Sequence, residues 1–380
     1  MEHKFDVPPV SVSCHPTEQL LAIGHLDGSV VLHQYSVNAE KSSLTERWTK
    51  RHKRAVRRVK FSLDGSGLFS ITKNRALCLW DVETGKKIRC LRTAHDEPPY
   101  SLAVLPATST KGQQVATADE GGVIRTWDFR ASLPQICEFH DQEEVINEMV
   151  VSEVQGAWLL SASADGTLAA YNLRARKLFV RSEPMHSDLL SVCTTPNGRT
   201  YVGGGDGYIE VFNHGEWGNL VERIETGHGD TVDCLVAIRP NLLASASTLD
   251  GSVRLTHINP NKKLGKIAGH EDGVEQLTTS PDGSLLMSVG LDDSLQLLDL
   301  DALTARIPVQ RASVKSPAVR LSSQRADGGF FADLNGGDGD ESSNSGDDED
   351  DNDDDAMDSD GDDDNDDGDQ LMGDDSDDDD

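Results

Sequence analysis

Apolar and polar residues alternate over short stretches through most of the chain, as in Val56–Phe61 (VRRVKF) and Val232–Ala237 (VDCLVA). A period of two residues is typical of a β-strand with one buried face, and the 3.6-residue period of long helices is absent. The stretches end at clusters of Gly, Asn, Asp or Ser, which favour turns. The pattern therefore predicts an all-β chain built from many short strands.

The alternating stretches belong to a unit that repeats seven times. One position recurs at intervals of 41 to 47 residues and is occupied by His33, Trp80, Trp127, Tyr171, Phe212, Thr256 and Leu298. Six residues before each of these lies the centre of a predicted turn, at Asp27, Asn74, Gly121, Asp165, Asp206, Asp250 and Asp292. Most of these turns contain Asp-Gly, a hairpin signal, because a tight turn needs a positive φ at its centre.

A second series of residues has the same spacing. It consists of histidines that each precede an alternating stretch: His52, His95, His140, His186, His228 and His270. Each unit then contains a histidine followed by four short strands separated by turns. Four-stranded units repeated at this period are typical of blades around a central channel. We therefore predict a seven-bladed β-propeller over residues 1–310. Either the N-terminal segment near Phe5 or residues 303–310 could supply the outer strand of the last blade.

The dipeptides Trp80-Asp81, Trp127-Asp128, Gly227-His228 and Gly269-His270 resemble WD repeats. In that family a histidine, a Ser or Thr, the turn Asp and the strand Trp form a hydrogen-bonded tetrad. The resemblance implies tetrads in three blades, namely His52, Thr72, Asn74 and Trp80; His140, Ser163 and Asp165; and His228, Thr248 and Asp250. Tyr171 and Thr256 replace the Trp in the last two. We interpret these histidines and aspartates as structural, because buried polar groups need hydrogen-bond partners.

Longer segments are similar to one branch of the WD-repeat proteins. His15–Ala22 (HPTEQLLA), Glu216–Arg223 (EWGNLVER) and Phe330–Leu334 (FFADL) before an acidic end resemble the WD repeat-containing protein 55 family. The resemblance implies a non-enzymatic scaffold of the nucleus and nucleolus that acts in ribosomal RNA production or ribosome biogenesis. Its implied partners are ribosome-assembly factors or basic ribosomal proteins. The sequence leaves open an additional cytoplasmic pool.

Charge divides the chain into three predicted parts. Residues 335–380 hold 25 Asp or Glu and no Lys or Arg, whereas residues 1–334 hold 41 acidic and 35 basic residues. The acidic segment has too few apolar residues to form a core, so we expect a disordered tail. Residues 311–334 read as a basic linker that carries the FFADL segment. Phe330, Phe331 and Leu334 are a candidate docking motif, because nothing near them in the sequence could bury them.

Two further motifs predict partner contacts. Seven basic residues lie between positions 50 and 60, and they are typical of a nuclear-import or nucleic-acid patch: Lys50, Arg51, Lys53, Arg54, Arg57, Arg58 and Lys60. They could equally form the solvent side of a strand or pair with the acidic tail. Trp127, Asp128 and Arg130 match the Trp-Asp-x-Arg pattern of substrate receptors in cullin-RING ubiquitin ligases. That function, with a ligase adaptor as partner, is the alternative to the scaffold.

Other classes of function find no support in the sequence. No nucleophile elbow, zinc-protease helix or paired-carboxylate motif is present, so we expect neither an enzyme nor a cofactor. Residues 1–334 carry a small negative net charge and should bind phosphate groups poorly, so we do not expect direct nucleic-acid binding. No apolar run exceeds five residues and no signal peptide is recognisable, which argues against a membrane protein. Six scattered cysteines indicate a reduced chain without a disulfide framework.

Overall fold

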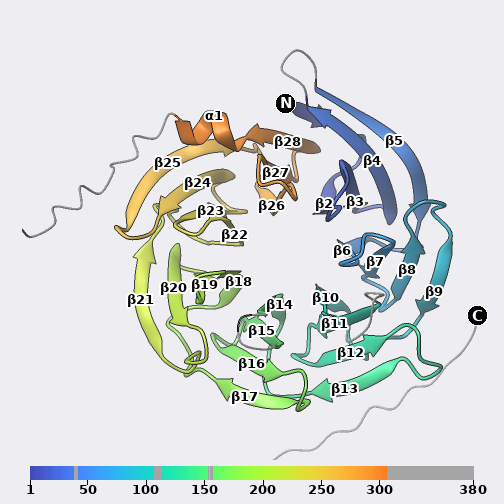
Figure 1. The fold of residues 1–380 in the computed structure, drawn as a ribbon, viewed down its shortest axis with the longest axis horizontal. Helices are drawn as coiled ribbons and strands as arrows, with labels where there is room; N and C mark the ends of the chain where they lie inside the picture. Colours follow the sequence, from blue (N-terminus) through green and yellow to red (C-terminus); the bar gives the residue numbers. More distant parts are fainter. Residues whose placement is uncertain (38–41, 107–112, 153, 155–156, 306–380) are drawn as a thin grey trace, which may run out of the picture. The chain divides into compact units, whose positions relative to one another are not determined.

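Seven four-stranded antiparallel sheets form a ring around a central channel in the computed structural model (Figure 1). The structure describes residues 1–37, 42–106, 113–152, 154 and 157–305. In blades one to six the strands run outward from the channel in sequence order. The prediction of an all-β, seven-bladed propeller is therefore confirmed.

Each of the first three blades has four consecutive strands. Blade one contains β2 (Pro9–Cys14), β3 (Leu20–His25), β4 (Ser29–Val37) and β5 (Ser42–Arg51). Blade two contains β6 (Val56–Phe61), β7 (Gly67–Thr72), β8 (Leu77–Asp81) and β9 (Lys87–Leu91). Blade three contains β10 (Pro99–Val104), β11 (Gln114–Asp119), β12 (Ile124–Asp128) and β13 (Gln135–Phe139).

The next three blades have the same order. Blade four contains β14 (Ile146–Ser152), β15 (Trp158–Ser163), β16 (Leu168–Asn172) and β17 (Lys177–Arg181). Blade five contains β18 (Leu189–Thr195), β19 (Arg199–Gly204), β20 (Tyr208–Asn213) and β21 (Leu220–Glu225). Blade six contains β22 (Cys234–Arg239), β23 (Leu242–Ala246), β24 (Ser252–His257) and β25 (Lys262–Gly269). All seven recurring positions of the sequence lie on the third strand of a blade.

Blade seven is assembled from both ends of the ring. Its strands β26 (Val274–Thr279), β27 (Leu285–Gly290) and β28 (Ser294–Asp299) are joined by β1 (Glu2–Lys4), which pairs antiparallel with β28. The backbone N–H of Phe5 extends this ladder by donating to the carbonyl of Asp293 at 2.8 Å. Residues Leu300–Ala305 form the helix α1, whose Leu300 is fully buried. The N-terminal segment therefore supplies the outer strand that closes the ring.

The hydrophobic core lies between neighbouring blades. Val30 and Leu32 of blade one, for example, pack in one cluster with Val59, Leu68 and Trp80 of blade two. Similar clusters join the other blades, including blades seven and one. Each blade therefore buries its two faces against its neighbours, which explains why second strands such as β3, β7 and β27 are buried along their whole length.

Tight turns join the second and third strands of the blades. Gly28 has a φ of 93°, and a Cβ atom there would lie 2.6 Å from the carbonyl oxygen of Arg54. Arg75 and Asp293 adopt positive φ at the corresponding position in blades two and seven. The recurring glycine is therefore needed for two reasons: the turn requires a positive φ, and a side chain at this position would collide with the backbone of the next blade.

A disulfide joins Cys78 on β8 to Cys90 on β9. The two residues are direct partners in the register of these strands, which places their side chains on the same face of the blade. The expectation of a chain without disulfides is therefore wrong at this pair. The reason is the register, which brings together two cysteines that are twelve residues apart in the sequence.

Candidate interaction surfaces

A complete tetrad is present in blade three. The Nδ1 atom of His95 lies 2.9 Å from Oδ2 of Asp119, and its Nε2 atom lies 2.6 Å from Oγ1 of Thr117. The indole N–H of Trp127 donates to the same Thr117 hydroxyl at 2.7 Å. All four side chains are almost fully buried. These buried groups satisfy one another's hydrogen-bonding capacity, as expected of a structural network.

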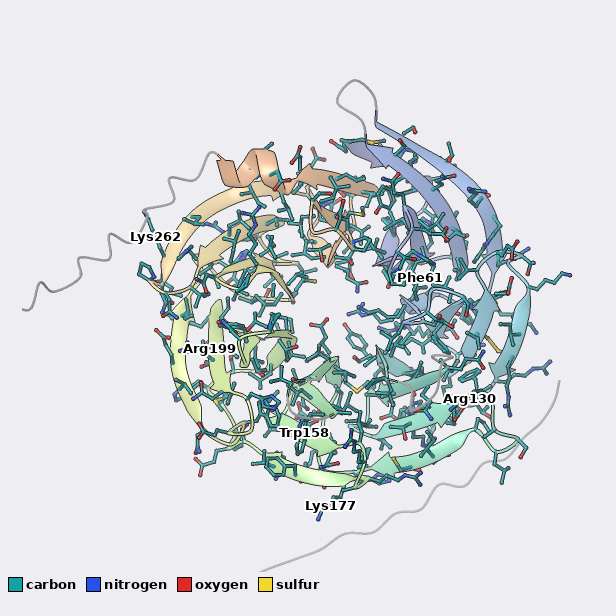
Figure 2. All side chains as sticks on the ribbon, in the orientation of Figure 1. Phe61, Arg130, Trp158, Lys177, Arg199 and Lys262 are labelled. Carbon is teal, nitrogen blue, oxygen red and sulfur yellow. A yellow bond between two sulfur atoms is a disulfide. The ribbon has the colours of Figure 1, made fainter. Side chains whose placement is uncertain are left out.

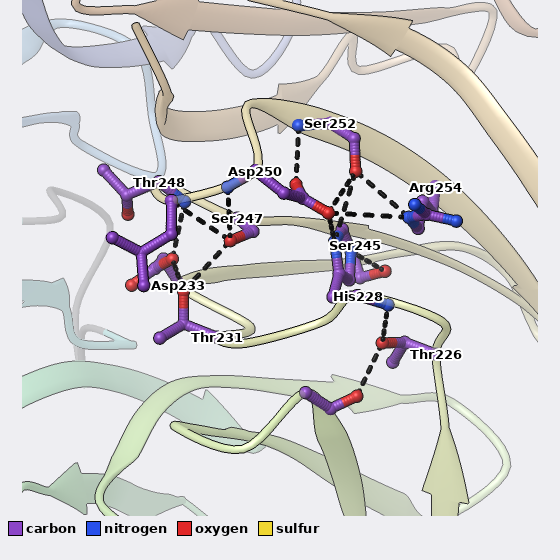
Figure 3. Close-up of polar contacts among 12 residues, drawn as sticks. Thr226, His228, Thr231, Asp233, Ser245, Ser247, Thr248, Asp250, Ser252 and Arg254 are labelled. Atoms are coloured by element: carbon purple, nitrogen blue, oxygen red, sulfur yellow. Dashed lines mark hydrogen bonds and ion pairs between the residues drawn. The ribbon is translucent and has the colours of Figure 1, made fainter.

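Blades six and seven carry the same network without the Trp. Figure 3 shows His228 between the carboxylate of Asp250, at 3.0 Å, and the hydroxyl of Ser245, also at 3.0 Å. His270 bridges Asp292 and Ser288 at 2.9 and 2.8 Å. At the Trp position of blade six, the hydroxyl of the fully buried Thr256 has no hydrogen-bond partner among the described residues.

The structure corrects the hydroxyl residue of all three expected tetrads, first in blades two and six. In blade two, Ser70 rather than Thr72 contacts His52, at 2.9 Å, and accepts from the indole of Trp80 at 2.8 Å. Thr72 instead donates to Asn74 at the turn. In blade six, Ser245 takes the place expected for Thr248. In both blades the hydroxyl lies nearer the middle of the second strand than expected, because it has to reach Nε2 of the histidine, and in blade two also the indole N–H of Trp80.

The expected tetrad of blade four is wrong at its histidine, His140, and at its hydroxyl residue, where Ser161 takes the place of Ser163. The side chain of His140 is 65% exposed and lies 3.0 Å from Glu138. Gln142 occupies the interior position: it accepts a hydrogen bond from the hydroxyl of Ser161, and its amide donates to Thr167. Ser163 and Asp165 remain at the turn, where Asp165 accepts from Thr167. An amide can donate and accept as a histidine does, so the network survives the substitution.

The basic run divides between two environments. Lys50 and Arg51 lie on the outer strand β5, and Lys53 and Arg54 are exposed in the loop that follows. Arg51 forms an ion pair with Asp27 at 3.1 Å. Arg57, Arg58 and Lys60 lie instead on β6, the strand next to the channel.

Lys60 and Arg58 interact electrostatically with carboxylates that lie on other channel-lining strands. Burial lowers the pKa of Lys60, an effect that the negative charge of Glu148 opposes. Burial also raises the pKa of Glu148, whose Oε2 atom accepts a hydrogen bond from the backbone N–H of Val192 at 2.9 Å. Arg58 is a further cation that acts on Glu148 and on Glu275. The first half of the run thus lies at the outside of the ring, where Arg51, Lys53 and Arg54 are exposed and Lys50 is partly exposed.

The Trp-Asp-x-Arg motif lies at the end of β12 and in the turn after it, near the outer edge of blade three (Figure 2). Trp127 is buried in the tetrad. The guanidinium of Arg130 donates to Asp128 through Nε at 2.8 Å and through Nη2 at 2.6 Å. This contact holds the pKa of the Asp128 carboxyl well below its usual range. The side chain of Arg130 is one-third exposed and folds back on Asp128. Leu133, in the same turn region, is 84% exposed.

Several functional candidates lie outside the described residues, namely Phe330, Phe331, Leu334, the basic linker and the acidic tail. Conversely, sequence reasoning missed Asp119 and Gln142 in the tetrads and Glu148 and Glu275 in the channel. Asp119 lies two residues before the expected turn position, so a fixed spacing passed over it. The channel carboxylates carry no sequence signal beyond their place on the first strand of a blade.

The described residues contain neither a metal-binding cluster nor a membrane-spanning helix. No group of three or more His, Cys, Asp or Glu in this part of the chain is arranged to hold a metal ion. None of the helices found there is long and apolar enough to cross a membrane.

Comparison with known proteins gives the family. The model of the WDR55 family matches residues 2–303. The chain belongs to the WDR55 family of WD-repeat proteins. WD repeat-containing protein 55 of Bos taurus is 33% identical over 337 residues, which cover 87% of this chain and 85% of that protein. The Homo sapiens protein is 33% identical over 304 residues, covering 79% of this chain and 76% of that protein.

A more distant relative and a solved structure extend the comparison. The WD repeat-containing protein 55 homolog of Aedes aegypti is 30% identical over 287 residues, 75% of this chain and 59% of that protein. A chain in a crystal structure of the mitotic checkpoint complex superposes with a TM-score of 0.68 at 18% identity, covering 79% of this chain and 91% of that chain. This second likeness supports the propeller fold alone. WD-repeat propellers of the WDR55 type are generally non-catalytic and suited to protein–protein interactions.

Proposed function

We propose that this WDR55-family propeller is a non-enzymatic scaffold that acts in ribosomal RNA production or ribosome biogenesis in the nucleolus. The observation that carries the proposal is the family match over residues 2–303, because the family resemblance implies this role. The polar networks of the blades support the non-enzymatic part. Their histidines, hydroxyls and carboxylates are paired within the blades and leave no exposed nucleophile–base pair in these networks.

Affinity purification of the tagged full chain from nuclear extract, followed by mass spectrometry, tests the scaffold proposal. Ribosome-assembly factors or basic ribosomal proteins should be enriched over a tagged control propeller. The proposal fails if these classes are no more abundant than in the control and if depletion of the protein leaves ribosomal RNA output unchanged.

We propose that the first half of the basic run, Lys50 to Arg54, is the nuclear and nucleolar localisation signal. Replacing Lys50, Arg51, Lys53 and Arg54 by Gln should shift a fluorescent fusion toward the cytoplasm, because the import signal depends on dense positive charge. The matched control replaces four exposed basic residues on other parts of the ring, Lys86, Arg174, Lys177 and Lys262. Equal nucleolar accumulation of both variants would show that these four residues are not the localisation signal.

The second candidate function is that of a substrate receptor for a cullin-RING ubiquitin ligase. It is favoured by Arg130 on an exposed turn beside Leu133, which offers a cation and an apolar side chain to an adaptor. Arg130→Ala should then abolish recovery of the adaptor in a pulldown while the melting temperature stays unchanged, because exposed ion pairs contribute ~0–1 kcal/mol. Arg174→Ala is the matched control, since Arg174 follows Tyr171-Asn172-Leu173 at the corresponding turn of blade four. An adaptor that is recovered equally with Arg130→Ala, or not recovered with the parent chain, argues against this candidate.

A further inference from the structure

A pocket of about 310 Å³ opens where the first strands of blades seven, one, two and three begin. Figure 1 shows these strands, β26, β2, β6 and β10, side by side around one part of the channel. We call the pocket and its rim the channel-mouth surface. Its cations are Arg57, Arg58 and Lys73, and its apolar residues include Val10, Leu26 and Leu291. All of these residues belong to the described part of the chain.

The cations of this surface are ordered but only partly neutralised. The guanidinium groups of Arg57 and Arg58 lie over the ring of Tyr100, at 5.1 and 5.5 Å from its centroid. Arg57 forms an ion pair with Glu120 at 2.8 Å. Arg58 donates to the carbonyl of Arg57, and among the described residues neither Arg58 nor Lys73 has an ion-pair partner. Stacking on an aromatic ring fixes a guanidinium without using up its donors, so Arg58 remains able to bind a carboxylate.

One carboxylate lines the pocket together with these three cations. It belongs to Glu275, and burial raises its pKa although Arg58 and Arg57 oppose that effect. Because burial disfavours the ionised form of Glu275, this carboxyl group neutralises less of the positive charge of the three cations. The pocket therefore favours a ligand that brings negative charge of its own.

The apolar part of the surface is exposed at two equivalent turns. Leu26 precedes the turn residue Asp27 in blade one, and Leu291 precedes Asp292 in blade seven. Leu26 is 52% exposed and Leu291 is 37% exposed, at turn positions where polar residues are common. Large apolar residues gathered at the rim of a pocket are typical of a binding site for protein.

We propose that the channel-mouth surface docks an acidic segment of a partner protein that carries an apolar side chain. The apolar side chain packs between Leu26 and Leu291, and carboxylates of the same segment pair with Arg58 and Lys73. A nucleic acid fits less well, because its longer charged backbone would extend from the pocket over the acidic loops of blades six and seven on the same face, which contain Asp230, Asp233, Glu271 and Asp272, whereas a short acidic segment can stay beside Arg58 and Lys73. This inference goes beyond the scaffold role and does not depend on where in the cell the protein acts.

Fluorescence anisotropy with the full chain tests the proposal. The probe is a labelled peptide in which a Leu-Phe pair lies between two short runs of Asp, and the comparison probes are the same peptide with Ser-Ser and a single-stranded RNA of equal length. We expect saturable binding of the first probe that weakens as salt is raised, because its charge contacts are partly exposed. Leu26→Asp should weaken binding about tenfold through loss of apolar burial. Lys73→Glu should weaken it about fivefold through charge reversal at the rim.

Matched controls keep each result interpretable. Leu249→Asp changes a leucine that is 69% exposed and precedes Asp250 in the corresponding turn of blade six, away from the pocket. Lys86→Glu changes an exposed lysine in a turn at the other end of the strands of blade two. Both controls should bind like the parent. Equal binding of the Ser-Ser peptide, tighter binding of the RNA, or equal losses in Leu26→Asp and Leu249→Asp would each overturn the proposal. Binding that appears only after residues 335–380 are removed would assign the surface to an acidic segment of this chain instead of a partner.

Discussion

Replacing Thr117 by Val should destabilise the propeller far more than the loss of one hydroxyl suggests. The hydroxyl of Thr117 accepts from the indole of Trp127 at 2.7 Å and lies 2.6 Å from Nε2 of His95. Valine has nearly the same shape, so packing is preserved while two buried polar groups lose their partner. A buried polar group without a partner costs ~1–3 kcal/mol, which gives roughly 2–6 kcal/mol for the two.

The expected change in melting temperature follows from the size of the ring. An unfolding entropy of ~2 cal/mol/K per residue over roughly 300 residues amounts to about 0.6 kcal/mol/K. A loss of roughly 2–6 kcal/mol therefore corresponds to a decrease of roughly 3–10 °C. Thermal unfolding followed by circular dichroism measures it, with all variants compared at one scan rate because irreversible transitions depend on that rate.

The matched control is the same substitution at Thr256. This threonine is also fully buried, but its hydroxyl has no partner among the described residues. Thr256→Val removes a buried polar group that is already unpaired, so it should leave the melting temperature unchanged or raise it by ~1–2 °C. A Thr117→Val variant that melts within 1 °C of the parent, or an equal decrease in both variants, would refute the reasoning.

Two further predictions concern acid stability and the extent of the folded unit. Burial lowers the pKa of His33 to about 4 from its ordinary 6.5, so the unfolded chain binds the proton more readily and stability is lost as the pH falls from 6.5 toward 4. Urea unfolding should show that His33→Phe removes roughly 2 kcal/mol of the loss between pH 7 and pH 5, and identical pH profiles for parent and variant would contradict this. Limited proteolysis should leave a resistant core that ends between residues 310 and 330, because the composition after residue 334 cannot form a core. A protected fragment that extends past residue 350 would show that this boundary is wrong.

The architecture was predictable because its signals are local. A turn such as Asp27-Gly28 has to adopt a positive φ whatever surrounds it, and seven such turns at a regular period leave few alternatives to a propeller. The polar networks were harder to assign, because they depend on how far a side chain reaches across two strands. Ser70 and Thr72 point to the same side of β7, and only the position of the Trp80 ring selects Ser70.

The interaction surfaces depend on three-dimensional placement even more strongly. The run from Lys50 to Lys60 reads as one continuous patch, but the pleat of β6 and the closure of the ring direct Arg58 and Lys60 toward the channel. The pocket beside Arg58 combines residues from four blades that are up to 281 positions apart in sequence, from Val10 to Leu291. No spacing rule within a single repeat could have grouped them.

The pairing of β1 with β28 has a consequence for synthesis of the protein on the ribosome. The strand that closes the ring is made first, and its partner Ser294–Asp299 emerges only after the other blades. At ~5–20 residues per second, that interval lasts roughly 15–60 seconds. Throughout it, the nascent chain carries an open arc of blades with two unpaired ends, which are the sites where strands of other chains could add. The interval before the two ends meet is therefore the time when the blades of this protein are most exposed to pairing with strands of other chains.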